Sequence, residues 1–408
     1  MKKATSVAFK RLRMENDKKK KVVVAMSPYK SLRDFTGQAV GYREKTKVII
    51  AMSGGIDSSV AAALLKKAGF DVIGFFMRFW HESSAGNWNR CCSSEAEKRA
   101  KMVAARLKIP FFVLDFRKEF KKKVVDYFLK ECKAGLTPNP CITCNKEIKF
   151  GLLFKKAVSL KADYIATGHY VKIARINSGF KIFRAKDRQK DQSYFLWALN
   201  QRQLKKTLFP LGNFTKKEVR NLAKKFRLPV LGIPESQEIC FIQTNINDFL
   251  KRKLKQKTGP IVKQINYRAM KIIDKKGIKS SVIGQHQGLA FYTIGQRKGI
   301  RLPDGPYYVL GKDLKKNFLV VTKNEKDLAS KELVADNVNW ISGQEPKLPI
   351  EAQVKIRYLT NPSLAIISKT KNNSYKLRFK QPQRAVTPGQ SVVFYRGGEM
   401  LGGGTIKN

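Results

Sequence analysis

Apolar and polar positions along residues 46–242 alternate in segments that predict strands and helices in turn. Short apolar runs typical of buried strands lie at 48–51, 71–79, 111–114 and 163–166. Segments predicted to be helical lie at 58–67, 94–107 and 146–159. Ser94 and Glu97 form a capping-box pattern at the start of the second one. Strands that alternate with helices predict an α/β domain, with a parallel sheet covered on both faces.

The pattern changes beyond residue 242. Residues 243–304 are basic and mixed, with glycine-rich turns, and we expect a small central domain there. From 305 to 408 short β-rich runs predict a C-terminal antiparallel β-barrel. These runs lie at 307–310, 318–322, 354–358, 365–368, 375–379 and 391–395. Residues 1–45 are basic, and we expect a poorly ordered extension.

The sharpest motif is the string SGGIDSS at residues 53–59, between the first apolar run and the first predicted helix. Glycines let the backbone approach an anion, and a helix N-terminus offers N–H groups and positive potential. Asp57 is suited to hold the Mg²⁺ that accompanies a polyphosphate. No lysine follows the second glycine, so this is not the Walker-type loop. The string resembles the PP-loop of enzymes that split ATP into AMP and pyrophosphate.

Composition narrows the class of partner. The chain has 408 residues, with 82 Lys and Arg against 31 Asp and Glu, a formal net charge of +51. Solvated lysines explain part of this excess, but such a field attracts polyanions and favours a nucleic-acid partner. We find no apolar run of the roughly 18 residues that a membrane helix needs, and no secretory signal. We therefore expect a cytoplasmic protein with no membrane association, most simply a monomer.

Six cysteines in a long chain without a signal indicate a reducing compartment rather than a disulfide scaffold. Cys141 and Cys144 lie in TPNPCITCNKEIKFG at 137–151, where two prolines precede a predicted helix. A helix N-terminus and the nearby Lys146 favour the thiolate that sulfur chemistry needs. Cys240, in SQEICFI at 236–242, reaches the same pocket only if its loop folds back over the ATP site.

Three interpretations of these thiols compete. The first is a catalytic pair without metal. The second is an iron–sulfur cluster held by Cys141, Cys144 and Cys240, with one open iron. The third is a structural zinc site, for which a second pair at zinc-ribbon spacing is lacking. Cys91, Cys92 and Cys132 are expected to be non-catalytic.

Taken together, the motifs resemble those of the tRNA-specific 2-thiouridylase family, over about residues 47–406. The supporting strings are AMSGGIDSS at 51–59, GFFMRFW at 74–80, CCSSEAEKRAK at 91–101, TPNPCITCNKEIKFG at 137–151, ATGHYVKI at 166–173, KDQSYFLWAL at 190–199, SQEICFI at 236–242, IGQRKGI at 294–300 and TPGQSVVFY at 387–395. The resemblance implies an adenine nucleotide hydrolase-like PP-loop domain and 2-thiolation of the wobble uridine in tRNAs for Lys, Glu and Gln.

The resemblance also implies roles for individual residues. ATP would be bound by Ala51, Met52, Ser53, Gly54, Gly55, Ile56, Asp57 and Ser58, with adenine and ribose near Met77 and Gly168. The base would be adenylated, Cys240 would carry a persulfide, and Cys144 would finish in a disulfide with Cys240. A persulfide-relay protein or cysteine desulfurase would supply the sulfur. Contacts to tRNA are implied for Asn139, Pro140, Cys141, His169, Lys190, Asp191, Gln192, Arg357, Tyr358 and Gln390.

One departure concerns Cys141. Many family members have an aspartate there, a proposed acid/base, so that role is in doubt for this chain. Rival hypotheses are another PP-loop tRNA-modifying or amide-forming synthetase, which needs no thiol pair, and an RNA-binding protein without catalysis, for which a damaged ATP loop would be expected. The sequence leaves the sulfur donor open.

Overall fold

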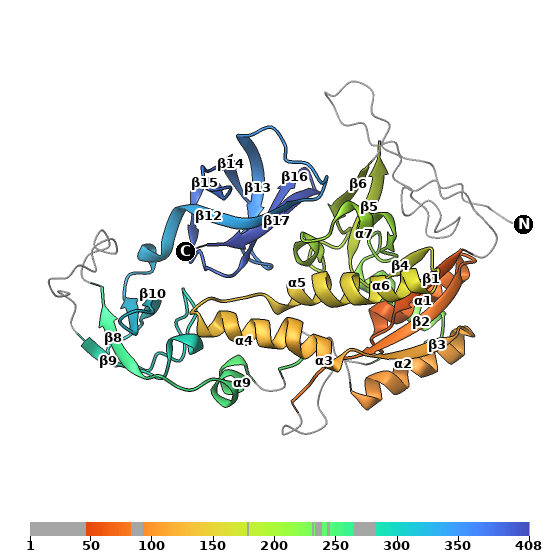
Figure 1. The fold of residues 1–408 in the computed structure, drawn as a ribbon, viewed down its shortest axis with the longest axis horizontal. Helices are drawn as coiled ribbons and strands as arrows, with labels where there is room; N and C mark the ends of the chain where they lie inside the picture. Colours follow the sequence, from red (N-terminus) through yellow and green to blue (C-terminus); the bar gives the residue numbers. More distant parts are fainter. Residues whose placement is uncertain are drawn as a thin grey trace, which may run out of the picture.

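The computed structural model describes residues 46–82, 93–177, 179–230, 232, 239–242, 245–264 and 282–407. The predicted basic extension at 1–45, Cys91 and Cys92 lie outside these residues. Figure 1 shows the strands of residues 47–115 at the right-hand end of the molecule and those of residues 259–286 at the left-hand end, with helices between them and the C-terminal strands of residues 329–406 above these helices. No helix in the described ranges combines the length and apolar character that a bilayer crossing requires.

The predicted parallel sheet is present, in the order β3-β2-β1-β4-β7, and every pairing in it is parallel. Its strands are β1 (Lys47–Ala51), β2 (Asp71–Arg78), β3 (Phe111–Asp115), β4 (Tyr164–Ala166) and β7 (Thr207–Leu208). Successive side chains of a strand point to opposite faces. In β2, Phe76 packs in the cluster with α1 and α2, whereas Phe75 and Met77 pack in the cluster with α4 to α6. Both faces are therefore buried.

Helices α1 (Ile56–Lys67), α2 (Ser94–Leu107) and α8 (Lys216–Lys225) cover one face. The other is covered by two long helical segments, each interrupted by a π-helical stretch. The first is α3 (Arg117–Phe120), η3 (Lys121–Val125) and α4 (Asp126–Lys133); the second is α5 (Pro140–Cys144), η4 (Asn145–Leu152) and α6 (Leu153–Ser159). An ion pair of 2.7 Å between Lys123 Nζ and Glu147 Oε2 joins the two π stretches.

The second long helix begins earlier than predicted. The sequence indicated a start at residue 146, whereas the helix starts at Pro140. Asn139 caps it by accepting a hydrogen bond from Cys141 N at 3.1 Å, and proline is well suited to the first helical position. Cys141 and Cys144 consequently lie in the first turns of the helix, not in a loop before it.

Further elements connect this domain to the rest of the chain. They are β5 (Val171–Ile176), β6 (Gly179–Arg184), η5 (Ser193–Leu196), α7 (Gln201–Lys205), α9 (Ile246–Lys253), η7 (Leu289–Phe291) and η8 (Glu325–Leu328). The central sheet has the order β10-β11-β8-β9, with β8 (Gly259–Lys263), β9 (Val282–His286), β10 (Tyr308–Asp313) and β11 (Phe318–Thr322).

Two strands predicted for the barrel belong elsewhere. The runs at 307–310 and 318–322 form β10 and β11, and β11 pairs in parallel with β8 of the central sheet. Their apolar pattern identifies them as strands, but it carries no information about which strand edge accepts their hydrogen bonds. The barrel prediction was therefore wrong for these two runs.

The C-terminal barrel is closed and antiparallel. It consists of β12 (Ala329–Trp340), β13 (Ile350–Lys355), β14 (Ser363–Lys369), β15 (Tyr375–Arg384), β16 (Ser391–Arg396) and β17 (Glu399–Ile406). Their order is β12-β15-β14-β13-β16-β17, and β12 pairs with β17 to close the ring. β17 also pairs with β6, Met400 opposite Ile182, so the β5–β6 hairpin, which lies between β4 and β7 of the parallel sheet in the chain, extends the barrel sheet. This continuity fixes the barrel against the first domain.

Candidate active site

The SGGIDSS loop connects β1 to α1 and is held by its own serines. Ser58 Oγ accepts a hydrogen bond from Ser53 N at 3.1 Å and donates to Gly55 O at 3.1 Å. Gly54 has φ of +72°, and a Cβ there would lie 2.1 Å from Ala96 O of α2. The loop therefore fits against α2 only with glycine at this position. Gly55, by contrast, has φ of −93° and faces open space apart from Ser53 Oγ, which would lie 3.6 Å from its Cβ.

The start of α1 differs from those of its neighbours. Helices α2, α8 and α9 are capped by the side chains of Ser93, Thr215 and Asn245, whereas α1 begins after Gly55 with no side-chain cap. The first N–H groups of a helix have no partner within the helix. An anion placed at Gly55 would receive those N–H groups and the positive end of the helix dipole.

Asp57, in the first turn of α1, is held by two residues that the sequence analysis did not identify. Lys216 Nζ lies 2.7 and 2.8 Å from its two carboxylate oxygens, and Tyr170 donates a hydrogen bond to Oδ1 at 2.7 Å. Lys216 is only 7% exposed although it opens α8 in a lysine-rich stretch. In the sequence Lys216 resembles an ordinary surface lysine, so only its tertiary contact with Asp57 identifies it as part of the site.

The other residues predicted for ATP gather at the carboxyl ends of the parallel strands. Ala51 ends β1 and Met52 follows it, while Met77 lies near the end of β2. Gly168 follows β4, and a Cβ there would lie 2.8 Å from Ser58 N. The loop after β4 is therefore packed directly on the N-terminus of α1. Ligand sites of open α/β sheets occur at this edge.

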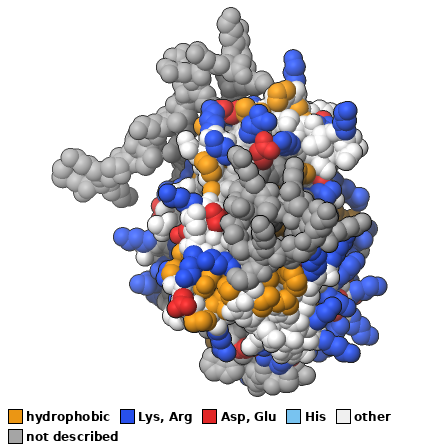
Figure 2. Space-filling view, turned by 90° about the vertical axis from the view of Figure 1, so that its left-hand side faces the viewer, with side chains coloured by type: hydrophobic (Ala, Val, Ile, Leu, Met, Phe, Trp, Pro, Cys, Tyr) orange, Lys and Arg blue, Asp and Glu red, His pale blue; other side chains and the backbone are white. Residues whose placement is uncertain are grey.

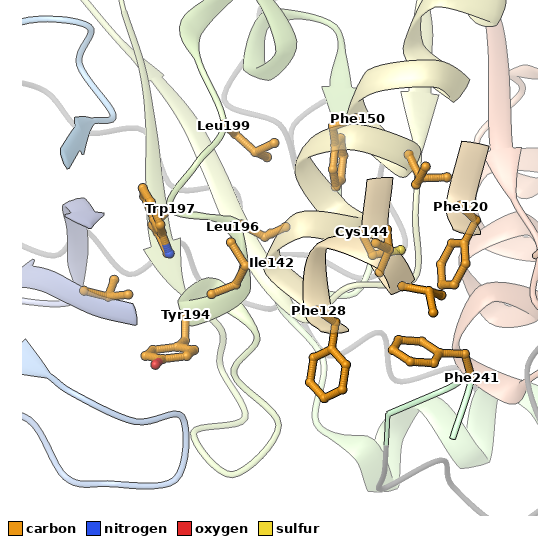
Figure 3. Packing of buried hydrophobic residues seen from close by; sticks show 14 of the residues in the cluster. Phe120, Phe128, Ile142, Cys144, Phe150, Tyr194, Leu196, Trp197, Leu199 and Phe241 are labelled. Carbon is orange, nitrogen blue, oxygen red and sulfur yellow. The ribbon is translucent and has the colours of Figure 1, made fainter. Parts of the chain in front are cut away.

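The two thiols of α5 have different environments. Cys141 is exposed on the first turn of the helix, whereas Cys144 is buried. The side chain of Cys144 belongs to the same hydrophobic cluster as Ala51 and Met77. Figure 3 shows it among the rings of Phe120, Phe128 and Phe241. Helix α5, which carries both thiols and is called the thiol helix below, thus packs on the face of the parallel sheet to which Ala51 and Met77 contribute.

Cys240 approaches the same region from a distant part of the chain. Phe241 is fully buried against Phe120 and Phe128, with ring centroids 5.8 Å apart in both pairs. Cys240 itself is half-buried and packs at the edge of the cluster that contains Cys144. The segment 239–242 therefore folds back onto α3 and α4, within the cluster that also contains Cys144.

Comparison with known proteins agrees with this architecture. Three family models match in order: a tRNA methyl transferase HUP domain over residues 46–244, a tRNA methyl transferase PRC-barrel domain over 247–323 and an aminomethyltransferase beta-barrel domain over 330–406. The tRNA-specific 2-thiouridylase MnmA of Carboxydothermus hydrogenoformans is 45% identical over 369 residues, which cover 89% of this chain and 98% of that protein. The chain belongs to the tRNA-specific 2-thiouridylase family.

A second relative supports the assignment. The tRNA-specific 2-thiouridylase MnmA of Heliobacterium modesticaldum is 45% identical over 367 residues, 89% of this chain and 92% of that protein. Among solved structures, the U34-tRNA thiolase NcsA from Methanococcus maripaludis with its 4Fe–4S cluster matches with 20% identity and a TM-score of 0.34, over 54% of this chain and 71% of that one. Similarity this low adds nothing to the argument about the site.

Several positions that family resemblance assigns to tRNA have structural partners within the chain. The Asp191 carboxylate accepts hydrogen bonds from Arg184 Nε at 3.0 Å, from Ala185 N and from Ser193. Gln192 Oε1 accepts one from Tyr170 N at 2.9 Å. Both residues therefore order the loop between β6 and η5, where Lys190 also lies, and their side chains are engaged in that task.

His169 is buried beside the nucleotide loop. Its Nδ1 lies 2.7 Å from Thr167 Oγ1, and its ring is near those of Phe150 and Phe209. Burial, and to a lesser extent Lys149, holds the pKa of His169 well below its ordinary value. The imidazole is therefore neutral at physiological pH and can take part in hydrogen bonds without adding charge.

Three of the residues that the resemblance assigns to tRNA belong to the C-terminal domain, namely Gln390, Tyr358 and Arg357. Gln390 Nε2 donates to Thr137 O at 2.7 Å, which ties the barrel to the segment that precedes Asn139 and Pro140. Tyr358 packs against Phe195 with ring centroids 4.5 Å apart. Arg357 NH2 contacts three acceptors, Ala385 O at 2.7 Å, Thr387 Oγ1 at 2.8 Å and Ile294 O at 3.4 Å.

The surface is rich in positive charge. Figure 2 shows Lys and Arg side chains around most of the rim of one face, with Asp and Glu scattered among them. Ion pairs neutralise some of these, such as Lys376 with Glu332 at 2.7 Å, but acidic partners are too few for a chain with net charge +51. The excess positive charge produces a long-range electrostatic field that favours binding of a polyanion.

Proposed function

We propose that the chain catalyses ATP-dependent 2-thiolation of the wobble uridine in tRNA, of the Lys, Glu and Gln type. The observation that carries this proposal is one hydrophobic cluster that contains Ala51 and Met77 from the nucleotide end of the sheet, Cys144 from the thiol helix and Phe241 beside Cys240. Within that cluster Phe241, next to Cys240, packs on Phe120 and Phe128, the rings among which Cys144 lies in Figure 3, and these contacts support a shared site for the two thiols on the face of the sheet that Ala51 and Met77 line. Family membership supports the substrate class.

In the first step, ATP would lie across Gly54, Gly55 and the N-terminus of α1, with adenine and ribose near Met77 and Gly168. The O2 atom of the uridine would attack the α-phosphorus, forming an adenylated base and releasing pyrophosphate. Asp57 is the residue suited to hold Mg²⁺ on the polyphosphate. Lys216, which pairs with Asp57 at 2.7 Å, would balance that carboxylate and contribute a cation near the phosphates.

In the second step, Cys240 would carry a persulfide delivered by a relay protein or a desulfurase. Its terminal sulfur would form a bond to C2 of the activated base. The Cys144 thiolate would then attack Sγ of Cys240, breaking the sulfur–sulfur bond, while AMP leaves with the original O2. The products are 2-thiouridine, AMP and a Cys144–Cys240 disulfide, which an external reductant returns to two thiols.

The alternative with an iron–sulfur cluster finds less support. A cluster needs its three thiolates directed at one point. Cys141 and Cys144 lie on one helix, the first exposed and the second buried, and the described residues contain no group of three His, Cys, Asp or Glu side chains arranged to hold a metal.

An acid/base role for Cys141 remains a proposal. Methyl transfer, which two family descriptions mention, needs no loop that binds polyphosphate.

The thiols are tested by single-turnover thiolation of tRNA with iron-free protein and a labelled persulfide donor. We expect Cys240→Ser to adenylate tRNA but accept no sulfur, and Cys144→Ser to accept sulfur on Cys240 and then stall. Cys141→Ser should keep substantial activity because no redox step uses it. Cys132→Ser serves as a control, since burial raises the pKa of the Cys132 thiol to about 12 and makes it unreactive.

Two results would contradict this assignment. Inactivity of the iron-free wild type, restored by iron and sulfide, would support the cluster instead. Activity that survives the loss of both Cys144 and Cys240 would favour a PP-loop synthetase that needs no thiol pair.

A further inference from the structure

Lys355 occupies an unusual position for a lysine. It is the last residue of β13, and its neighbours Val354 and Ile356 both point into the barrel core. Because side chains alternate along a strand, Lys355 lies on the outer face of the barrel. Its partner across the strand pair, Val393, belongs to the cluster that contains the thiol helix. The side chain of Lys355 therefore enters the junction between the barrel and the first domain.

The Lys355 side chain is largely buried, and its ammonium has no acceptor among the described residues. The residue is 7% exposed, and Nζ has no hydrogen bond or ion pair within the described residues. Burial, and then Arg184, lowers the pKa of Lys355, while Asp191 opposes that shift. Asp191 is already bonded to Arg184 at 3.0 Å. Since burial of the side chain removes part of the hydration of the ammonium and no acceptor replaces it, this position is suited to receive an anion.

A short chain of contacts connects this amine to the thiol helix. Lys355 Nζ lies 5.7 Å from the centre of the Tyr358 ring, which packs against Phe195. The carbonyl oxygen of Phe195 accepts a hydrogen bond of 3.1 Å from the side chain of Asn145, the residue after Cys144. An anion at Lys355 would therefore lie beside the ring of Tyr358, which is connected through Phe195 to the thiol helix.

We propose that Lys355 binds a backbone phosphate of tRNA next to the nucleotide that enters the thiol site, an inference that rests on the proposed function. A basic group beside aromatic rings is the arrangement used for single-stranded nucleotides, with the phosphate on the cation and a base on the ring. Arg357 is less suited, because its guanidinium already donates to Ala385 O and Thr387 Oγ1. Lys355 supplies the phosphate contact, whereas Arg357 ties the segment after β13 to Ala385 and Thr387.

The test measures tRNA affinity over a salt series for wild type, Lys355→Met and Lys355→Arg. Methionine keeps most of the length of the side chain and removes its charge. We expect Lys355→Met to lower affinity about tenfold, as for one charge-assisted hydrogen bond. The slope of log affinity against log salt should fall by roughly 0.7, the value expected when one phosphate is no longer neutralised. Lys355→Arg should keep the slope. Lys371→Met, at an exposed lysine of the same barrel, controls for removal of charge alone.

Thermal unfolding of each variant distinguishes a binding role from a structural one. An unchanged salt slope in Lys355→Met, or an equal decrease in affinity in Lys371→Met, would overturn the proposal. If Lys355→Met does not fold, Lys355→Gln replaces it, and failure of both while Lys355→Arg folds would also overturn it. Binding is measured without turnover, so wild type that binds tRNA but does not thiolate it contradicts the proposed function and leaves the Lys355 result valid.

Discussion

We predict opposite effects for alanine at the adjacent residues Gly54 and Gly55. Substitution of Gly54 should lower stability, whereas substitution of Gly55 should lower ATP affinity. An alanine at Gly54 would take φ of +72°, which costs roughly 1–2 kcal/mol for an L-residue. Its Cβ would also lie 2.1 Å from Ala96 O, a backbone atom that no rotamer change can move. Overpacking of this kind costs about 1–3 kcal/mol. Gly54→Ala should therefore lower the free energy of unfolding by roughly 2–5 kcal/mol and shift the loop away from α2.

An alanine at Gly55 meets no such obstacle, since φ is −93° and the nearest atom is 3.6 Å from the added Cβ. Loss of the glycine cap and lower entropy of the unfolded chain oppose each other, each by less than about 1 kcal/mol. Stability should therefore change by less than about 1 kcal/mol. The new methyl group stands where we place a phosphate, so ATP affinity should fall at least about tenfold, which corresponds to about 1.4 kcal/mol.

The assay pairs ATP binding by titration calorimetry with thermal unfolding for wild type, Gly54→Ala and Gly55→Ala. The expected pattern is a less stable Gly54→Ala and a stable Gly55→Ala with weak ATP binding. Normal ATP affinity in Gly55→Ala would refute a phosphate site at the start of α1. A large decrease in the stability of Gly55→Ala would show that the steric reasoning itself is wrong.

Two further predictions concern Lys216 and His169. Lys216→Ala should slow pyrophosphate release about 10- to 100-fold, because it removes a charge-assisted contact at the SGGIDSS loop. The control is Lys217→Ala, at the exposed neighbouring lysine, and equal rates in both variants would exclude a role for Lys216 at the phosphates. The folded-state pKa of His169 lies below that of the unfolded chain, so only the unfolded state takes up the proton below pH 6.5 and stability is lost as pH falls. Measured with denaturant, the free energy of unfolding of wild type should fall relative to that of His169→Gln by up to about 1.4 kcal/mol per pH unit below 6.5. A difference between the two proteins that does not change with pH would contradict the burial of a neutral His169.

The elements that sequence analysis located best are those determined by local pattern. The strand at 111–114 is observed as Phe111–Asp115, and the helix predicted at 94–107 is Ser94–Leu107. The predicted capping residue of that helix was displaced by one position, because Ser93 rather than Ser94 accepts the hydrogen bond from Ala96 N. The helix start at Pro140 was missed because prolines were interpreted as part of a loop, although proline is equally suited to the first turn.

By itself, the sequence determined the parallel sheet, the glycine loop before α1 and the residue types available for sulfur chemistry, because periodicity and turn residues act over a few positions. The tertiary structure decided which distant residues meet. Lys216 reaches Asp57 across 159 positions, Phe241 brings Cys240 to the cluster of Cys144, and β11 pairs with β8 rather than with the barrel. Such contacts depend on how the faces of helices and sheets pack and on which strand edge is unpaired. The local pattern of the residues involved determines neither.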